Sequence, residues 1–153
     1  LDSIFATIRR CPQHRFYLLT KQPQNLVKFS PFPENCFVGV SATNREQYLK
    51  ATGAEGLDGI EAKVKFISFE PLLENIGSSK YRLAAVNWVI IGAQTKPYKP
   101  PRIEWVWEIV EAADRAMIPV FHKNNLRTLL GDNLRQEFPL TFLPKGLRQE
   151  FPK

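Results

Sequence analysis

Five short apolar segments recur along the chain, and each of them ends in a group of polar residues. They are 16–19, 37–40, 64–69, 88–91 and 118–121. All are rich in β-branched and aromatic residues, and their hydrophobicity is nearly continuous rather than alternating. Such segments are typical of parallel strands that are covered on both faces. The pattern therefore predicts five parallel strands.

Helical patterns lie between these strands. The clearest covers 101–117, where Pro101 can begin a helix and an apolar stripe lies opposite charged residues. The stripe consists of Ile103, Val106, Val110, Ala113 and Met117, and the charged residues are Glu104, Glu108, Glu111 and Arg115. Shorter helices are expected at the N-terminus (cap Asp2 or Ser3; apolar face Ile4, Phe5, Ile8 and Cys11), from Pro23 (Leu26 and Phe29 inward) and over 45–51. The segment 74–85 has no clear pattern, and 77–79 is expected to be a loop.

Alternating strands and helices indicate either an open doubly wound sheet or a βα barrel. A doubly wound nucleotide-binding sheet usually has a glycine-rich turn after its first strand, whereas Thr20-Lys21-Gln22-Pro23 contains no glycine. The barrel is therefore favoured. A complete eight-unit barrel needs about 250 residues, and the chain has 153. We expect a partial βα barrel of about five parallel strands with outer helices, lacking one or more N-terminal strands.

The barrel domain is expected to cover 1–130, followed by a peripheral tail over 131–153. This tail holds the same hexapeptide twice, at Leu134–Pro139 and Leu147–Pro152. A spacing of thirteen residues is too short for the repeats of a solenoid. We interpret the two copies as a local duplication.

Composition places the chain among ordinary globular proteins, with 44% hydrophobic and 24% charged residues. It contains neither an apolar run of about 18 residues nor an N-terminal signal-peptide pattern, so a cytoplasmic location is expected, without membrane partners. The formal charge of +6 favours anionic partners, such as nucleotides or nucleic acid. The basic residues are scattered, however, and a solvated surface explains them equally well.

The sequence offers few metal ligands. It has two cysteines, Cys11 and Cys36, and two histidines, His14 and His122, without a Cys-x-x-Cys pair. A metal site made by this chain alone is not expected. Both cysteines are expected to be buried and apolar, with a disulfide as the alternative.

Candidate chemistry lies where the strands end, because the loops at the carboxyl ends of parallel strands meet around one cleft. Lys21 and Lys123 can bind a phosphate or carboxylate, and Glu70 can act as a base or accept a hydrogen bond. These three are the candidate catalytic residues. An ion pair that closes the cleft without chemistry is the alternative. The candidate ligand-binding residues are Thr20, Ser41, Asn44, Ser68, Gly92 and Gln94.

Other residues near the cleft have weaker patterns. Gly92 indicates close approach of the backbone to a ligand or a strand, and a lone His122 is more often structural. The segment 96–101 is a basic, proline-rich loop with the aromatic residue Tyr98, and it can stack on a base or cover the cleft. Trp105 and Trp107 are expected to pack beneath their helix.

The strand ends also resemble, in order, successive motifs of one known family. The matching segments are Leu19–Pro23, Val38–Ser41, Phe66–Leu73, Trp88–Gly92 and Pro119–Lys123. They resemble the bacteriophage gene-product thirty-seven/sixty-eight family, which is uncharacterised and similar to radical S-adenosylmethionine enzymes. The resemblance implies a partial βα barrel with an N-terminal three-cysteine cluster motif.

This resemblance sets the expected function. The chain would be the C-terminal part of a radical S-adenosylmethionine-like phage protein, supplying a ligand cleft. S-adenosylmethionine and a four-iron four-sulfur cluster are expected only if a cysteine motif lies upstream. The alternative is a non-catalytic binding or interaction module, or a nucleic-acid-associated barrel without a cluster. In the family, another strand precedes the one that corresponds to 16–19. We therefore expect the strand 16–19 of this chain to lie at a sheet edge, where self-association can occur.

Overall fold

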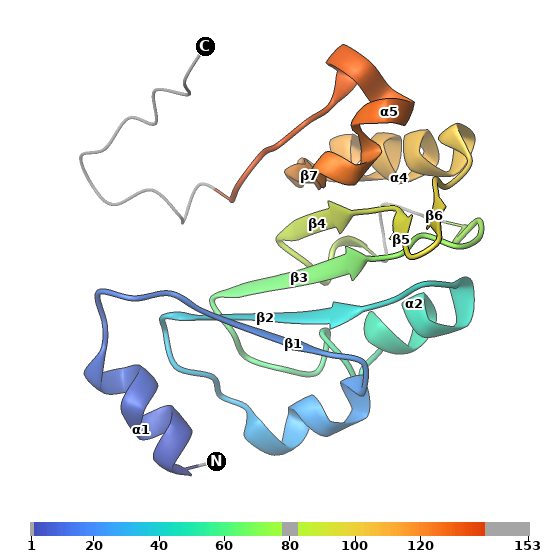
Figure 1. Ribbon diagram of the computed structural model, residues 1–153. Coiled ribbons are helices and arrows are strands. Elements are labelled where there is room, and N and C mark those ends of the chain that lie inside the picture. Colours follow the sequence, from blue (N-terminus) through green and yellow to red (C-terminus); the bar gives the residue numbers. More distant parts are fainter. Residues whose placement is uncertain (1, 78–82, 140–153) are drawn as a thin grey trace.

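A computed structural model describes residues 2–77 and 83–139 of the chain (Figure 1). Its centre is a five-stranded sheet of β1 (Phe16–Thr20), β2 (Cys36–Ser41), β3 (Val64–Phe69), β4 (Trp88–Ile91) and β7 (Val120–His122). Every pair of neighbouring strands is parallel. All five predicted strands are confirmed. The last one begins later than predicted, after Pro119, which has no N–H group for a strand ladder.

The strands lie in the sheet in the order β1-β2-β3-β4-β7, which is their order along the chain. A doubly wound sheet reverses its order at a switch point, and this sheet has no such reversal. The order is instead that of consecutive βα units. β1 lies at one edge of the sheet, as predicted, so its outer side is paired with no described strand.

The predicted helices are present, although the helix predicted over 101–117 begins at Ile103 rather than at Pro101 and ends at Arg115. They are α1 (Asp2–Arg10), the 3₁₀ helix η1 (Pro23–Phe29), α2 (Arg45–Ala51) and α4 (Ile103–Arg115). Three short turns follow β7: η2 (Asn124–Leu126), α5 (Arg127–Leu130) and η3 (Gly131–Asn133). Most of the segment 74–85 lies among the described residues, but 78–82 does not, so the expected loop at 77–79 is only partly described. No helix among the described residues has the length and hydrophobicity needed to cross a bilayer.

Two apolar residues do not lie where the helical patterns place them. Ile4 is exposed on α1, although Ile8 on the same helix is buried. Met117 was assigned to the buried stripe of α4, yet 92% of it is exposed. The helix ends before Met117, which has a positive φ of 56°. The N–H of Ile118 donates to the carbonyl of Ala113, so the end is a Schellman motif with Met117 at its left-handed position.

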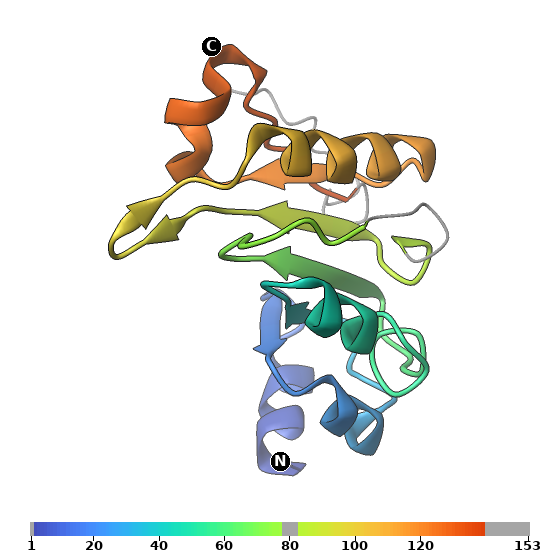
Figure 2. The same ribbon diagram turned by 90° about the vertical axis from the view of Figure 1, so that its right-hand side faces the viewer.

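The helices cover one face of the sheet. Strand residues such as Val38, Ile67 and Val89 belong to the main hydrophobic core together with Ile8, Tyr48, Val106 and Ile109 of the helices. Figure 2 shows the sheet from another side, with α2 and α4 beside it. Trp105 and Trp107 are half-buried and pack against this core, which confirms their predicted packing role.

The opposite face, here called the second face, has its own aromatic cluster. Phe37, Val64, Phe66 and Trp88 are buried in it, with Ile90, Phe121 and Phe138 packed against them. No described helix contributes to this cluster. Gly39 makes room for it, because a Cβ atom at this position would lie 2.3 Å from the ring of Phe66. Since strand side chains alternate between faces, Ser41, Ser68, Glu70, Gly92 and Lys123 continue the same face beyond the aromatic rings.

A small hairpin follows β4 and was not predicted. It consists of β5 (Gln94–Thr95) and β6 (Tyr98–Lys99), which pair antiparallel. The hairpin projects beyond the carboxyl end of the sheet (Figure 2). The basic, proline-rich segment 96–101 therefore lies partly in a strand.

Candidate functional site at the carboxyl ends of the strands

The polar residues that follow β3, β4 and β7 are held in place by a continuing backbone ladder. The N–H of Gly92 donates to the carbonyl of Phe69 at 3.0 Å, and the N–H of Lys123 donates to the carbonyl of Ile91 at 2.9 Å. These bonds extend the sheet by one residue past the strand ends. The side chains of Glu70 and Lys123 therefore start from fixed positions on the second face.

Glu70 and Lys123 form an ion pair across the end of β4. Gly92 lies beneath this pair: a Cβ atom at residue 92 would lie 3.1 Å from Cδ of Lys123 and 3.3 Å from Cγ of Glu70. The close approach of the backbone predicted for Gly92 is thus an approach to neighbouring side chains. The Glu70 side chain is 31% exposed and that of Lys123 is 41% exposed, so both remain accessible to a ligand.

Two serines extend the polar surface toward the centre of the second face. Ser41 and Ser68 are partners in the β2–β3 register, with exposed fractions of 9% and 2%. Neither hydroxyl makes a side-chain hydrogen bond with any described residue. Neither hydroxyl oxygen is among the fully enclosed atoms that lack a partner, so both remain available to a ligand. We call Ser41, Ser68, Glu70 and Lys123, with Gly92 beneath the ion pair, the carboxyl-end cluster.

Asn125 was not among the predicted site residues, yet it organises the edge of this cluster. Its Oδ1 accepts a hydrogen bond from the N–H of Ala93 at 3.1 Å, and its Nδ2 donates to the carbonyl of the same residue at 2.9 Å. The hydroxyl of Tyr98 donates to the carbonyl of Asn125 at 3.1 Å. Asn125 therefore ties the β5–β6 hairpin to the end of β7. Its only signal in the sequence is its place among the four polar residues at the end of the last strand, 122–125.

The other predicted site residues lie outside the cluster. Thr20 and Lys21 follow the edge strand β1, and Oγ1 of Thr20 accepts the N–H of Gln22 in a local turn. Lys21 is exposed and pairs with no carboxylate among the described residues, so the predicted trio of charges is a pair in the structure. Asn44 is the N-cap of α2, where Oδ1 accepts the N–H of Gln47 at 2.9 Å.

Gln94 lies in the hairpin, with Nε2 donating to the carbonyl of Pro97 at 3.1 Å. His122 lies on the helix-covered face of the sheet and is fully buried. Its Nδ1 accepts the N–H of Arg135 at 3.0 Å. Burial, followed by the positive charge of Arg135, lowers the pKa of His122 to about 4. The ring is therefore neutral near pH 7, which agrees with the structural role predicted for it.

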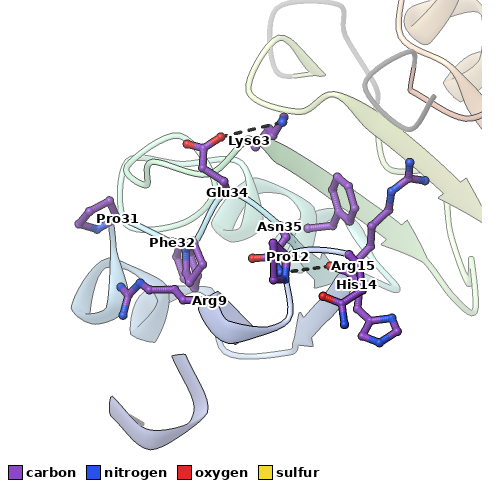
Figure 3. Close-up of a pocket in the computed structure, with 12 residues that line it drawn as sticks. Arg9, Pro12, His14, Arg15, Pro31, Phe32, Glu34, Asn35 and Lys63 are labelled. Atoms are coloured by element: carbon purple, nitrogen blue, oxygen red, sulfur yellow. Dashed lines mark hydrogen bonds and ion pairs between the residues drawn. The ribbon is translucent and has the colours of Figure 1, made fainter. Parts of the chain in front are cut away.

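A groove of about 780 Å³ lies at the opposite end of the sheet, where the strands begin (Figure 3). Its basic residues Arg9, His14 and Arg15 point in different directions. Lys63 approaches Glu34 at 3.9 Å. Asn35 uses Nδ2 to bind the carbonyls of Ile8, Cys11 and His14, which connects the end of α1 to the start of β1. This groove lacks convergent polar groups, so the carboxyl-end cluster is the better candidate site.

The described residues do not offer a metal site. They contain no group of three or more histidine, cysteine, aspartate or glutamate side chains that could hold a metal ion. Cys11 and Cys36 are free thiols rather than a disulfide. Cys36 is fully buried and belongs to the main core, whereas Cys11 is only half-buried. Burial is also the main cause of the raised pKa of Cys36.

The fold and site define a parallel α/β protein with a polar cluster at the carboxyl ends of its strands. A profile of the family described as Protein of unknown function (DUF5131) matches residues 1–128. The chain belongs to this family. The match includes all five strands of the sheet and ends before the first copy of the repeated hexapeptide. No curated protein and no solved structure matches the chain.

Proposed function

We propose that the chain is a partial βα barrel that binds a nucleotide-like ligand at the carboxyl-end cluster. Support for the barrel comes from the strand order, which follows the chain without reversal, and from helices that cover one face only. In barrels built this way, ligands bind at the carboxyl ends of the strands. The second face would then be the inner wall of the barrel.

The observation that carries the proposal is the position of two serine hydroxyls, which bond no described side chain, beside an accessible ion pair. Ser41 and Ser68 are mostly buried and make no side-chain hydrogen bond with a described residue, and they lie on the same face as Glu70 and Lys123. Lys123 suits a phosphate or carboxylate, and Glu70 suits an amine or a ribose hydroxyl. The ring of Phe121, which packs in the aromatic cluster, offers an apolar surface beside these groups.

S-adenosylmethionine combines these features in one molecule, because it has a carboxylate, an ammonium group, ribose hydroxyls and a base. The resemblance to the phage family favours it as the ligand. The residues of this chain do not fit the iron–sulfur cluster of a radical enzyme, which requires three cysteine thiolates, whereas the sequence has two cysteines. This count favours a second candidate, a binding module without catalysis.

Calorimetric titration with S-adenosylmethionine and with adenosine monophosphate tests the proposal. We expect the wild type to bind at least one of them, and Glu70→Gln and Lys123→Met to weaken that binding tenfold or more. Removing an accessible ion pair costs about 1 kcal/mol of stability or less, so the melting temperature of Glu70→Gln should change little. Glu46→Gln is a matched control, because Glu46 forms an exposed ion pair with Lys50 on α2 and is not part of the carboxyl-end cluster.

Two results would contradict the proposal. One is the absence of binding of either probe to a folded wild type. The other is a large loss of stability in Glu70→Gln, since the ion pair would then be a structural element of the fold. Anaerobic reconstitution separates the enzyme from the module: stoichiometric iron and sulfide on this chain would favour the radical enzyme.

A further inference from the structure

The first copy of the repeated hexapeptide, Leu134–Pro139, lies against the free edge of β7. Gln136 forms an antiparallel bridge with Phe121. The N–H of His122 donates to the carbonyl of Arg135 at 2.6 Å, and the N–H of Glu137 donates to the carbonyl of Val120 at 3.0 Å. The hexapeptide is therefore joined to the edge of β7 by one antiparallel bridge with two backbone hydrogen bonds beside it, in the way that peptides bind to an exposed sheet edge.

Side chains of the first copy add specific contacts on both sides of this strand. The guanidinium of Arg135 binds both oxygens of Asp114 on α4, at 3.0 and 2.8 Å, and also contacts Glu137. Oε2 of Glu137 accepts the N–H of Val120 at 3.0 Å. On the second face, the ring of Phe138 packs against Trp88 and Phe121, with ring centroids 5.6 and 5.3 Å away.

Trp88 completes the site, because its indole Nε1 donates to the carbonyl of Glu137 at 2.9 Å. Each of these contacts is made either by the backbone or by a side chain of the sequence Leu-Arg-Gln-Glu-Phe-Pro. We call the β7 edge, together with Asp114 and Trp88, the hexapeptide site. Its ligand is defined by sequence, and the same sequence occurs again at Leu147–Pro152.

We propose that the hexapeptide site binds Leu147–Pro152 of the same chain in exchange with Leu134–Pro139. The chain thus has one docking site and two copies of its ligand. Binding within one chain is favoured over binding between chains, because a short linker keeps the second copy at an effective concentration in the millimolar range. When the second copy is bound, the linker that follows α5 covers 131–146 instead of 131–133. Closing this longer loop costs more entropy, which favours the first copy by about tenfold.

Disulfide trapping tests this exchange directly. Phe121 and Gln136 face each other between two ladder hydrogen bonds, and a pair of this kind brings its Cα atoms to within about 4.5 Å, which a disulfide can span. The position of the second copy that corresponds to Gln136 is Gln149. In a chain with Cys11→Ala and Cys36→Ala, the reference variant is therefore Phe121→Cys/Gln136→Cys, and the test variant is Phe121→Cys/Gln149→Cys.

In dilute protein under a glutathione redox buffer, we expect both variants to form an intramolecular disulfide, the test variant about ten times more slowly. Adding Arg135→Ala to the test variant should accelerate trapping several-fold, since it weakens the competing first copy. Adding Arg148→Ala should slow trapping, and it serves as the matched control. Mass spectrometry identifies the bond formed.

Three outcomes overturn the proposal. The first is a reference variant that oxidises while the test variant stays reduced. The second is a test variant that forms only covalent dimers, which would mean that the second copy binds another chain. The third is a trapping rate that neither arginine substitution changes. Because Phe121→Cys is common to both variants, any loss of stability that it causes affects them equally and leaves their comparison valid.

Discussion

The carboxylate of Glu70 and the ammonium group of Lys123 meet across β4, although β3 and β7 are not neighbouring strands. The pair reaches over Gly92, which leaves room for the aliphatic parts of both side chains. Three strands that lie side by side in the sheet thus contribute to one contact. The ends of β3 and β7 supply the charged side chains, and the end of β4 supplies a glycine that leaves room for them. The geometry of the candidate site depends on this arrangement.

Gly92→Ala should weaken ligand binding at the carboxyl-end cluster with only a modest loss of stability. The new methyl group would lie 3.1 and 3.3 Å from carbon atoms of Lys123 and Glu70, so both side chains must shift by a few tenths of an ångström. We expect the dissociation constant to rise about tenfold and the free energy of unfolding to fall by about 1 kcal/mol. Calorimetric titration and urea denaturation measure the two effects. An unchanged dissociation constant in a chain that binds ligand would contradict this prediction.

The stability of the protein should depend on pH through His122. Its pKa is about 4 in the folded protein and about 6.5 in the unfolded chain. Between these values the unfolded chain binds more protons, so stability rises with pH from about 4 to 6.5 and is lost as the pH falls through this window. The full difference corresponds to about 3 kcal/mol.

Urea denaturation at pH 7 and pH 4.5 measures this dependence. His122→Gln removes the titrating ring, while its amide oxygen can still accept the N–H of Arg135, so the loss of stability at pH 4.5 should become smaller. His14→Gln is the control, because His14 is exposed. The same pH dependence in His122→Gln and in the wild type would show that other groups cause it.

Met117→Gly should stabilise the protein. Met117 has a φ of 56° and is almost fully exposed, and glycine is preferred at this position of a Schellman motif because it has no Cβ atom. We expect the free energy of unfolding to rise by about 0.5–1 kcal/mol, as measured by thermal and urea denaturation. Met117→Ala is a control that shortens the side chain and retains the Cβ atom. Equal effects of the two substitutions would contradict the backbone explanation.

Self-association, if it uses the β1 edge, should be reduced by Leu19→Lys. Leu19 is 53% exposed on this edge strand, and a charged residue there opposes pairing with another strand. Light scattering over a range of concentrations measures the effect. Leu73→Lys is the matched control, because Leu73 is 45% exposed but lies outside the edge strand. Equal effects of both substitutions would indicate general hydrophobic association rather than edge pairing.

The strands of the sheet could be predicted from the sequence because a strand that is buried on both faces is apolar along its whole length. The segments 64–69 and 88–91 match β3 and β4 at both ends, and 45–51 matches α2. Local patterns were less informative about where a helix ends and the chain turns away. The apolar Met117 fitted the stripe of α4, but the turn at the end of that helix places it in solvent, and no periodicity records such a turn.

The candidate site was predictable only in part. Polar residues at strand ends pointed to Glu70, Lys123 and Gly92, since parallel strands end at the same edge. The pattern did not specify which strands would be adjacent, so Lys21 was grouped with two residues that lie farther along the sheet. The role of Asn125 depends on two hydrogen bonds to the backbone of Ala93, and these arise only from the tertiary fold.

The two edges of the sheet differ, and this difference limits how copies of the chain can assemble. The hexapeptide Leu134–Pro139 covers the β7 edge, whereas β1 forms the other edge. Within the part of the chain that the structure describes, one edge is open, so in the language of polymer chemistry the folded chain is a monofunctional monomer. Pairing of one β1 edge with another gives a closed, two-fold dimer that cannot grow further. Release of the hexapeptide would make the monomer bifunctional, and strand pairing at both edges would then permit open-ended fibres.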